Sequence, residues 1–577
     1  MAIVVVIAGT YLGFQQFADS SCSGSVKLNV AAAPEIVPAV KAIADQWTKA
    51  GAAVNGTCVA VDVTDELPAT IASAVSRDHS VALIGLPPAP ESVQAPDVWV
   101  PDSSTWLLRL QTEAAGFLPQ TITSVAQSPL VLAMPEPIAK QAFNWPKGKV
   151  GWANLLANFS TDEPMSVGIM DPTQDASGLT SLLALSQAST AASGTNPIEG
   201  LKAKSRALTA LDTNKAVLRE ELLARFPKSE TDLFGPNTVS AAPLSEEDVV
   251  AYNAERPAIP LSAIYLEPSP APLDYPYTIM PQVVDAQKAD AAEGLRLQLL
   301  APAAKNALAA AGLRAPDGTY GANFPAPMGA PQSSPAVTPP AATKAPDGKA
   351  ASAALTGGDL SAVVGGWIAT TKPGQALTVF DTSGSMAEPV PTAGGKSRAQ
   401  VTQQAASVGL SLFSNKWSVG VWRFSTNENG AKPWKQLVPI TSLVKGREEL
   451  QDSINDLDPK EGGGTGLYDT VLDAYLHAKK NYSPQKINSV ILFTDGKNEN
   501  ADGITDDKLV AELKKAQDPK KPIRLVLIGI GDKVSVEELK MIRDALPGSN
   551  SGVFLAPDPT LITSIFAQAI GSRTGVI

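Results

Sequence analysis

Histidine and cysteine are scarce in this chain, and their scarcity excludes several kinds of chemistry. The 577 residues include two histidines, His79 and His477, which lie far apart in the sequence. A His-rich zinc site, or a Ser-His-Asp or Cys-His mechanism, needs such residues gathered in one place. The two cysteines, Cys22 and Cys58, would form one disulfide in an oxidising compartment. The alternative is a pair of separate buried thiols.

Basic residues are outnumbered by acidic ones. There are 46 Lys and Arg against 57 Asp and Glu, a formal net charge of −11. Because the phosphates of a nucleic acid select a basic face, we expect no nucleic-acid partner. Hydrophobic residues make up 44% and charged residues 18% of the chain, which is typical of a folded protein. A chain of this length exceeds one hydrophobic core, so we expect several domains.

Long apolar runs are also rare. Residues 2–17 form one at the start of the chain, with the length of a signal-peptide core and short for a membrane span. We interpret residues 1–20 as the outer part of a signal-anchor, with a buried N-terminal strand as the alternative. No second long apolar run follows in the sequence. We therefore expect an extracytoplasmic protein, anchored to the cell membrane by its N-terminus or secreted.

Strand-like and helix-like segments alternate through residues 24–320. This alternation predicts an α/β domain with largely parallel sheets, and about 300 residues would suit two lobes. The expected strands are 26–31, 59–63, 81–85, 98–101, 128–134, 165–169 and 261–266, and the main expected helices are 34–49, 67–76, 198–225, 285–300 and 302–313.

Two segments of this domain carry a resemblance. The stretch Pro-Asp-Val-Trp-Val-Pro-Asp-Ser-Ser-Thr-Trp at 96–106 and the turn at 171–178 resemble bacterial extracellular solute-binding proteins of the two-lobe type. The resemblance implies that strand 128–134 crosses a hinge, that strand 261–266 returns, and that strand-end loops line a cleft for a small molecule.

Helix-start amides in that cleft are the candidate ligand-binding groups. Amides beside Ser104, Thr105, Ser177 and Gly178 could hold an oxyanion or a carboxylate. Alternatively, these serine and threonine side chains are ordinary helix N-caps.

A proline-rich segment divides the chain. Seven prolines lie between Pro325 and Pro346, mixed with alanine, serine, threonine and glycine. This composition cannot bury a core and predicts an extended spacer over residues 321–358. A second domain then covers residues 359–577. Its expected strands, 376–380, 417–424, 490–493, 524–530 and 552–555, alternate with helices and predict a doubly wound, Rossmann-like sheet.

Three polar elements of the second domain are placed to meet. Asp381, Ser383 and Ser385 follow the apolar strand 376–380, Thr465 lies in a glycine-rich loop, and Asp495 follows strand 490–493. Ligands of open parallel sheets bind at the carboxyl ends of the strands. Carboxylate and hydroxyl oxygens suit Mg²⁺, with Mn²⁺ or Ca²⁺ as alternatives. Turns and N-caps without a metal are the competing interpretation.

In this order the three elements resemble the metal-ion-dependent adhesion site of von Willebrand factor A domains, and the resemblance covers residues 360–577. It implies that Ser383, Ser385 and, in at least one state, Thr465 bind the metal directly. Asp381 and Asp495 would act through water, and an Asp or Glu carboxylate of a protein partner would fill the open position.

The order of the two domains is similar to a family of two-module actinobacterial proteins. That resemblance carries architecture and metal binding only. Our first hypothesis is a non-enzymatic binding protein of the cell envelope, which adheres to or assembles with a protein partner through a divalent metal. A ligand in the first domain could modulate it. The alternative is an extracellular solute receptor that serves a transporter or sensor, with the second domain as a docking module. A metal-dependent hydrolase is disfavoured, since no histidine or paired-carboxylate base accompanies the site.

Overall fold

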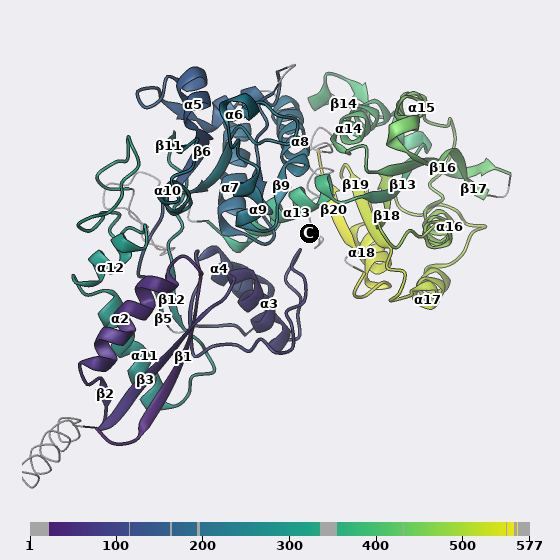
Figure 1. Ribbon diagram of the computed structural model, residues 1–577. Helices are drawn as coiled ribbons and strands as arrows, with labels where there is room; N and C mark the ends of the chain where they lie inside the picture. The colour runs from purple at the N-terminus through teal and green to yellow at the C-terminus, as the bar shows by residue number, and fades with distance from the viewer. Residues whose placement is uncertain are drawn as a thin grey trace, which may run out of the picture. The chain divides into compact units, whose positions relative to one another are not determined.

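The computed structural model describes residues 22–114, 116–119, 121–161, 164–192, 197–334, 355–430, 432–549, 551–558 and 562. The chain divides into two compact units (Figure 1). The first consists of Met1–Ala188 and Thr213–Ser361, and the second of Ser189–Asp212 and Ala362–Ile577. The expected signal-anchor lies outside the described residues. Within the described ranges, no helix has the length and apolar character needed to cross a membrane.

The first unit is an α/β structure with two lobes, each built on its own sheet. One sheet has the order β2-β3-β1-β4-β12-β5 and the other has the order β10-β6-β11-β7. The strands of the first sheet are β1 (Ser25–Ala32), β2 (Ala53–Val54), β3 (Thr57–Asp65), β4 (Val98–Val100), β5 (Thr121–Ser124) and β12 (Pro276–Ile279). Those of the second are β6 (Leu130–Pro135), β7 (Val150–Gly151), β10 (Ala242–Ser245) and β11 (Leu261–Glu267), beside the pair β8 (Ile169–Met170) and β9 (Lys215–Ala216).

Helix α2 is an example of a helix that buries one apolar face against these strands. In α2, Val37, Val40 and Ile43 recur at helical spacing and are buried. The helices of residues 22–334 are α2 (Val37–Lys49), α3 (Pro68–Asp78), α4 (Thr105–Glu113), α5 (Glu136–Phe143), α6 (Trp152–Asn158), α7 (Ala176–Ala192), α8 (Pro197–Thr213), α9 (Arg219–Ala224), α10 (Glu246–Ala254), α11 (Ala286–Leu299) and α12 (Ala304–Ala310).

The chain passes between the two lobes at neighbouring places. Ser128 pairs with Leu273, and the Val125 amide donates to the Tyr275 carbonyl at 3.1 Å. Just beyond this crossing, β6 and β11 pair antiparallel in the second sheet. The two segments that the resemblance named as hinge crossing and return therefore lie side by side.

Two secondary-structure expectations for the first unit are wrong. Residues 81–85 form no strand, because the Ile84 amide donates to Glu113 at 2.8 Å and the Ile84 carbonyl accepts from Arg109 at 2.6 Å. Side chains of α4 thus replace the partner strand that this apolar run would need. The stretch 198–225 is not continuously helical either. Strand β9 interrupts it, because a partner is available in β8.

The predicted disulfide between Cys22 and Cys58 is present. The start of the proline-rich segment differs from its expectation, however. The rings of Tyr320 and Phe324 stack at 4.8 Å, and the Pro331 carbonyl accepts from the buried Arg314 at 2.9 Å. Residues 321–334 are therefore held against the first unit, because their backbone carbonyls satisfy a buried guanidinium. Residues 335–354 lie outside the described part.

The second unit contains the doubly wound sheet that the alternation of segments predicted. The order is β17-β16-β13-β18-β19-β20, and all neighbours are parallel except β16 and β17. The antiparallel edge strand β17 was not predicted, because it is half-exposed and contains two prolines, Pro433 and Pro439, which argue against a strand. The strands are β13 (Gly374–Asp381), β16 (Ser418–Asn429), β17 (Lys432–Ser442), β18 (Ile487–Thr494), β19 (Arg524–Ile530) and β20 (Gly552–Ala556), with the short pair β14 (Pro389–Val390) and β15 (Lys396–Ser397).

Helices cover both faces of this sheet. Along β13, Ala376 and Phe380 pack with α14 and α15, whereas Leu377 and Val379 pack with α16, α17 and α18. This alternation buries every residue of the strand from Ala376 to Asp381. The helices are α13 (Gly357–Thr371), α14 (Arg398–Leu412), α15 (Leu443–Asn455), α16 (Leu467–Lys480), α17 (Asp506–Ala516) and α18 (Val536–Asp544).

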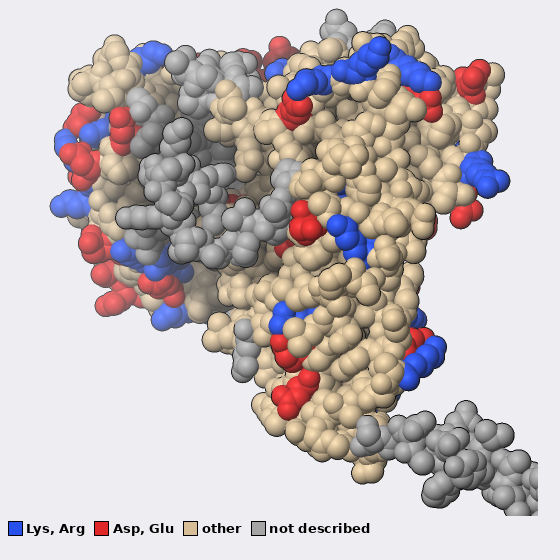
Figure 2. Space-filling view, turned by 90° about the vertical axis from the view of Figure 1, so that its left-hand side faces the viewer, with Lys and Arg blue, Asp and Glu red and all other residues tan. Residues whose placement is uncertain are grey.

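Charged side chains of both signs are interspersed on the face drawn in Figure 2, apart from a short basic run at its upper edge. Broad areas of that face carry neither basic nor acidic side chains. Together with the net charge of −11, this distribution is unlike the extended basic surface that nucleic acids select.

Candidate metal centre and ligand pocket

The candidate metal site lies where the strand order of the second unit reverses. Strand β13 has β16 on one side and β18 on the other. Phe380 and Phe493 are paired in register, and their rings stack at 4.9 Å. Asp381 ends β13 and Asp495 follows β18, so this pairing brings the two carboxylates to the same edge of the sheet.

Hydrogen bonds join four of the five expected metal ligands. Ser385 Oγ donates to Asp495 Oδ1 at 2.7 Å, although the two residues lie 110 positions apart. Ser383 Oγ and Ser385 Oγ are 3.1 Å apart. Asp381 Oδ1 accepts from the Ser383 amide at 2.8 Å, and its Oδ2 accepts from Thr494 Oγ1 at 2.7 Å. The three-dimensional structure thus gathers residues that the sequence holds in separate loops.

Thr465, the fifth expected ligand, approaches the same place from the glycine-rich loop. A side chain at Gly496 would put its Cβ 2.9 Å from Thr465 Oγ1, so the threonine hydroxyl lies against the backbone that follows Asp495. Thr465 is 1% exposed, and its backbone is fixed because its carbonyl accepts from the Glu499 amide at 2.8 Å.

Arg398 belongs to this site but carried no recognisable signal in the sequence. Its Nη1 donates to Asp495 Oδ2 at 2.9 Å, leaving Oδ1 toward Ser385. Arg398 begins α14 directly after its capping residue Ser397, a position that indicates helix geometry and nothing about a metal. Only the tertiary structure shows that a guanidinium offsets part of the acidic charge.

Burial dominates the electrostatics of the Asp381 carboxyl group. It raises the pKa of Asp381 to about 7, and the nearby Asp495 charge adds to this increase. Hydrogen bonds from Ser383 and Thr494 oppose it. Such a site favours the arrival of positive charge.

The donor set fits a hard divalent cation. It consists of two carboxylates and three hydroxyls, which are oxygen ligands of the kind that Mg²⁺, Mn²⁺ and Ca²⁺ accept. Groups of three or more His, Cys, Asp or Glu side chains arranged to hold a metal are absent from the described residues. That result agrees with a site in which most ligands would be hydroxyls.

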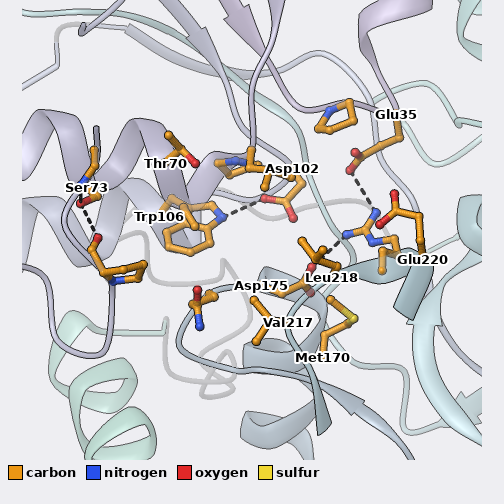
Figure 3. Close-up of a pocket in the computed structure, with 18 of the residues that line it drawn as sticks. Glu35, Thr70, Ser73, Asp102, Trp106, Met170, Asp175, Val217, Leu218 and Glu220 are labelled. Atoms are coloured by element: carbon orange, nitrogen blue, oxygen red, sulfur yellow. Dashed lines mark hydrogen bonds and ion pairs between the residues drawn. The ribbon is translucent and has the colours of Figure 1, made fainter. Parts of the chain in front are cut away.

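A pocket of about 210 Å³ lies between the two lobes of the first unit (Figure 3). Its lining comes from loops after β1, β4, β8 and β9 and from the start of α3 and α9. Carboxylate side chains, the Trp106 indole and an apolar rim surround it. The polar and charged residues that line it are Glu35, Thr70, Ser73, Asp102, Gln174, Asp175, Arg219 and Glu220.

The four expected ligand-binding residues do not line this pocket. The Ser104 amide donates to Asp274 at 2.6 Å, and the Thr105 amide donates to Ser103 Oγ at 3.2 Å. Asp175 Oδ1 accepts from the amides of Ser177 at 2.8 Å and Gly178 at 3.2 Å. These amides are therefore already capped by side chains of the chain itself.

A charged cluster that sequence reasoning missed lies beside them. Arg219 contacts Asp175 at 3.1 Å, Asp248 at 3.3 Å and Glu35 at 3.6 Å. Asp102, 3% exposed, accepts from Trp106 Nε1 at 2.8 Å. Asp102 and Asp175 do follow predicted strands, which is a usable signal, but Arg219 comes from a segment that was expected to be continuous helix.

The comparisons with known proteins agree with the two-unit architecture. Residues 28–314 match the family described as bacterial extracellular solute-binding protein, and residues 377–568 match the von Willebrand factor type A domain. The chain therefore contains an N-terminal solute-binding domain and a C-terminal von Willebrand factor A domain, as expected. Two Mycobacterium tuberculosis sequences, described as uncharacterized proteins, are each 24% identical over 599 residues, covering 98% of this chain and 81% of the relative.

Solved structures resemble each part separately. The sulfate-binding protein SubI of Mycobacterium tuberculosis is 18% identical, covering 51% of this chain and 88% of its own, with a TM-score of 0.33. A periplasmic thiamin binding protein is 11% identical, covering 60% and 94%, with a TM-score of 0.37. Proximal thread matrix protein 1 of the mussel byssus, with a zinc-occupied metal-ion-dependent adhesion site, is 21% identical, covering 34% and 47%, with a TM-score of 0.26.

Proposed function

We propose that this chain is a non-enzymatic binding protein of the cell envelope, which attaches to a protein partner through a divalent metal in its von Willebrand factor A domain. Mg²⁺ is the expected metal, with Mn²⁺ or Ca²⁺ as alternatives. Asp381, Ser383, Ser385, Thr465 and Asp495 would hold it. The observation that carries the proposal is the 2.7 Å hydrogen bond between Ser385 and Asp495, which joins the two strand-end loops at one point.

The chemistry of the site indicates what kind of partner would bind. The negative charges of two carboxylates would offset the charge of a divalent ion. Arg398, however, already neutralises part of the negative charge of Asp495. A bound cation would therefore retain a tendency to attract a further anionic ligand. A carboxylate from an Asp or Glu of the partner would supply it. Anchoring of the N-terminus in the cell membrane, or secretion, would place the site outside the cell.

A titration of the full chain with MgCl₂ tests the metal site. We expect calorimetric binding and a rise in the unfolding temperature, since a ligand at about 100 times its Kd adds about 2.7 kcal/mol to the stability. Ser385→Ala should weaken Mg²⁺ binding by about tenfold or more. Ser411→Ala, on the exposed side of α14, is the matched control and should bind normally. Equal Mg²⁺ affinity in both variants would overturn the assigned ligands.

Capture from cell membranes then tests the partner. The tagged wild-type chain should retain a protein in MgCl₂ and release it into a chelator, and Ser385→Ala should not retain it. A synthetic peptide carrying a central Asp should compete, and the same peptide with Asn should not. Retention that is equal in chelator, or equal with Ser385→Ala, would contradict metal-dependent adhesion.

The second candidate function is reception of a small molecule by the first domain, for a transporter or a sensor. The pocket between its lobes favours this function, because solute-binding domains hold their ligands at such a place. The two functions are compatible, since each uses a different domain.

A further inference from the structure

We propose that the pocket of the solute-binding domain takes a small organic cation, with a protonated amine against Asp102 and an alkyl body against the apolar rim. The inference deepens the second candidate function, on which it rests. It follows from a carboxyl oxygen that faces the pocket, from the charge of the lining and from the apolar rim.

One oxygen of the Asp102 carboxyl group faces the pocket. Its Oδ1 accepts from Trp106 Nε1, but in the described part of the chain no hydrogen bond reaches Oδ2. Figure 3 shows the carboxyl group at the wall of the pocket, with its second oxygen directed away from Trp106 and into the space between the lobes. This oxygen is therefore placed to accept from a ligand N–H group.

The lining has more acidic than basic groups. Glu35, Asp102, Asp175 and Glu220 face the pocket, and Arg219 is the one cationic residue among its lining residues, all of which are described. Arg219 already contacts Glu35, Asp175 and Asp248. An incoming cation would therefore meet uncompensated carboxylates, and an incoming anion would meet repulsion.

The helix-start amides that the sequence suggested for an anion lie outside the pocket lining. Asp274 caps the Ser104 amide, and Asp175 caps the amides of Ser177 and Gly178. The remaining wall suits an alkyl body, since it is formed by apolar side chains, among them Leu67, Pro68, Pro88, Met170, Val217 and Leu218.

Binding of a cation would be coupled to a proton. Burial raises the pKa of Asp102, and Glu35 and Asp175 raise it further, whereas Arg219 and the Trp106 hydrogen bond lower it. On the neighbouring α10, burial raises the pKa of Glu247 to about 9, so this carboxyl adds little negative charge at neutral pH. A cation against Asp102 lowers its pKa, and the carboxyl then releases its proton to solvent as the ion pair forms.

Calorimetry on the full chain tests the inference with named probes. The cations are n-butylammonium, putrescine and agmatine, n-butanol is the neutral control, and sulfate is the anion. We expect at least one cation to bind, with a proton released to the buffer, as shown by a binding enthalpy that depends on the ionisation enthalpy of the buffer. Asp102→Asn should weaken the binding by about tenfold or more, because one charge-assisted hydrogen bond is lost. Asp62→Asn, on the exposed surface of β3, should leave it unchanged.

Each other outcome has a defined meaning. Sulfate or n-butanol bound in preference to the cations would overturn the ligand class and leave solute binding intact. Failure of every probe would count against both the ligand class and a working solute pocket. If Asp102→Asn does not fold, the wild type decides, and equal binding of n-butylammonium and n-butanol would overturn the role of Asp102. Mg²⁺ binding in the second domain would be unaffected in every case.

Discussion

At the scale of single residues, both candidate sites depend on a buried carboxyl group that hydrogen bonds from the protein hold in place. Asp381 is fixed by Ser383 and Thr494, and Asp102 by Trp106. Burial raises the pKa of both carboxyls. Their ionised forms therefore cost the folded protein free energy, and a bound cation would recover it.

Replacement of Asp102 should change the pH dependence of stability. Its folded pKa is raised above the unfolded value, so the stability it contributes is full below its ordinary pKa of about 3.9 and is lost as pH rises through the raised value. Asn does not titrate and can still accept from Trp106. Asp102→Asn should therefore match the wild type near pH 4 and unfold at a higher temperature near pH 8. Thermal unfolding across this range, with Asp62→Asn as control, measures the difference. A variant that is less stable than wild type at about pH 8 would contradict the prediction.

Gly496 is the position at which one added methyl group should disturb the metal site selectively. The new Cβ would lie 2.9 Å from Thr465 Oγ1 and push the hydroxyl aside. Gly496→Ala should lower Mg²⁺ affinity by about 10- to 100-fold, while the domain stays folded. Gly366→Ala on α13 is the control, because its Cβ would meet no atom within 4 Å. Unchanged Mg²⁺ affinity in Gly496→Ala would show that Thr465 takes no part.

At the scale of elements, one ion pair joins segments that lie far apart in the sequence. Arg314 Nε and Nη2 donate to Glu246 at 2.6 and 2.7 Å, and Tyr265 of β11 donates to the same carboxylate at 2.5 Å. Both charged side chains are 0% exposed. Glu246 begins α10, and Arg314 follows α12 next to the crossing between the lobes. The pair thus connects the second sheet with the end of the first unit.

Removal of one member of this pair should be more costly than removal of both. Arg314→Met would leave Glu246 buried without its cation and should destabilise the first unit by about 3–5 kcal/mol. In the double variant Arg314→Met with Glu246→Leu, no uncompensated charge remains, so the loss should be smaller. Urea unfolding of the wild type, the two single variants and the double variant forms the required cycle. Additive losses would disprove the coupling.

The secondary structure of two segments differs from expectation because it depends on residues elsewhere in the chain, which the local sequence pattern does not identify. Residues 81–85 have the composition of a strand, but Arg109 and Glu113 satisfy their backbone. Strand β17 contains two prolines, which argue against a strand, but it pairs with β16 over most of its length. In both segments the neighbouring residues determine whether a strand forms, because a strand needs a second strand to complete its hydrogen bonds.

At the scale of the whole molecule, the chain joins a solute-binding domain to a von Willebrand factor A domain. The match to an extracellular solute-binding family suggests a location outside the cytoplasm, and the disulfide between Cys22 and Cys58 suits an oxidising compartment. The two domains have separate cores and separate candidate sites. A change confined to one domain should therefore leave the intrinsic chemistry of the other unchanged.

Loss of the disulfide tests this separation. The bond closes a loop of 36 residues, so the variant with both Cys22→Ser and Cys58→Ser should lose about 4 kcal/mol of stability in the first unit. Calorimetry should show a lower unfolding temperature for the first unit. The rise in the unfolding temperature of the second unit on addition of MgCl₂ should persist. A variant that loses the Mg²⁺ response would contradict the independence of the two domains.

The sequence by itself determined the α/β class and the order of the two domains, and it named residues that the structure brings together at the candidate metal site. It could do so because apolar strands followed by polar loops, and the spacing of Asp381, Ser383 and Ser385, are local patterns. Only the tertiary structure decided the contacts of Arg398 with Asp495, the capping of Ser104 and Ser177, and the pocket around Asp102. Each of these contacts joins segments that are far apart in the sequence or that lie on different elements. They therefore depend on how the lobes and strands pack, and a local sequence pattern does not show this.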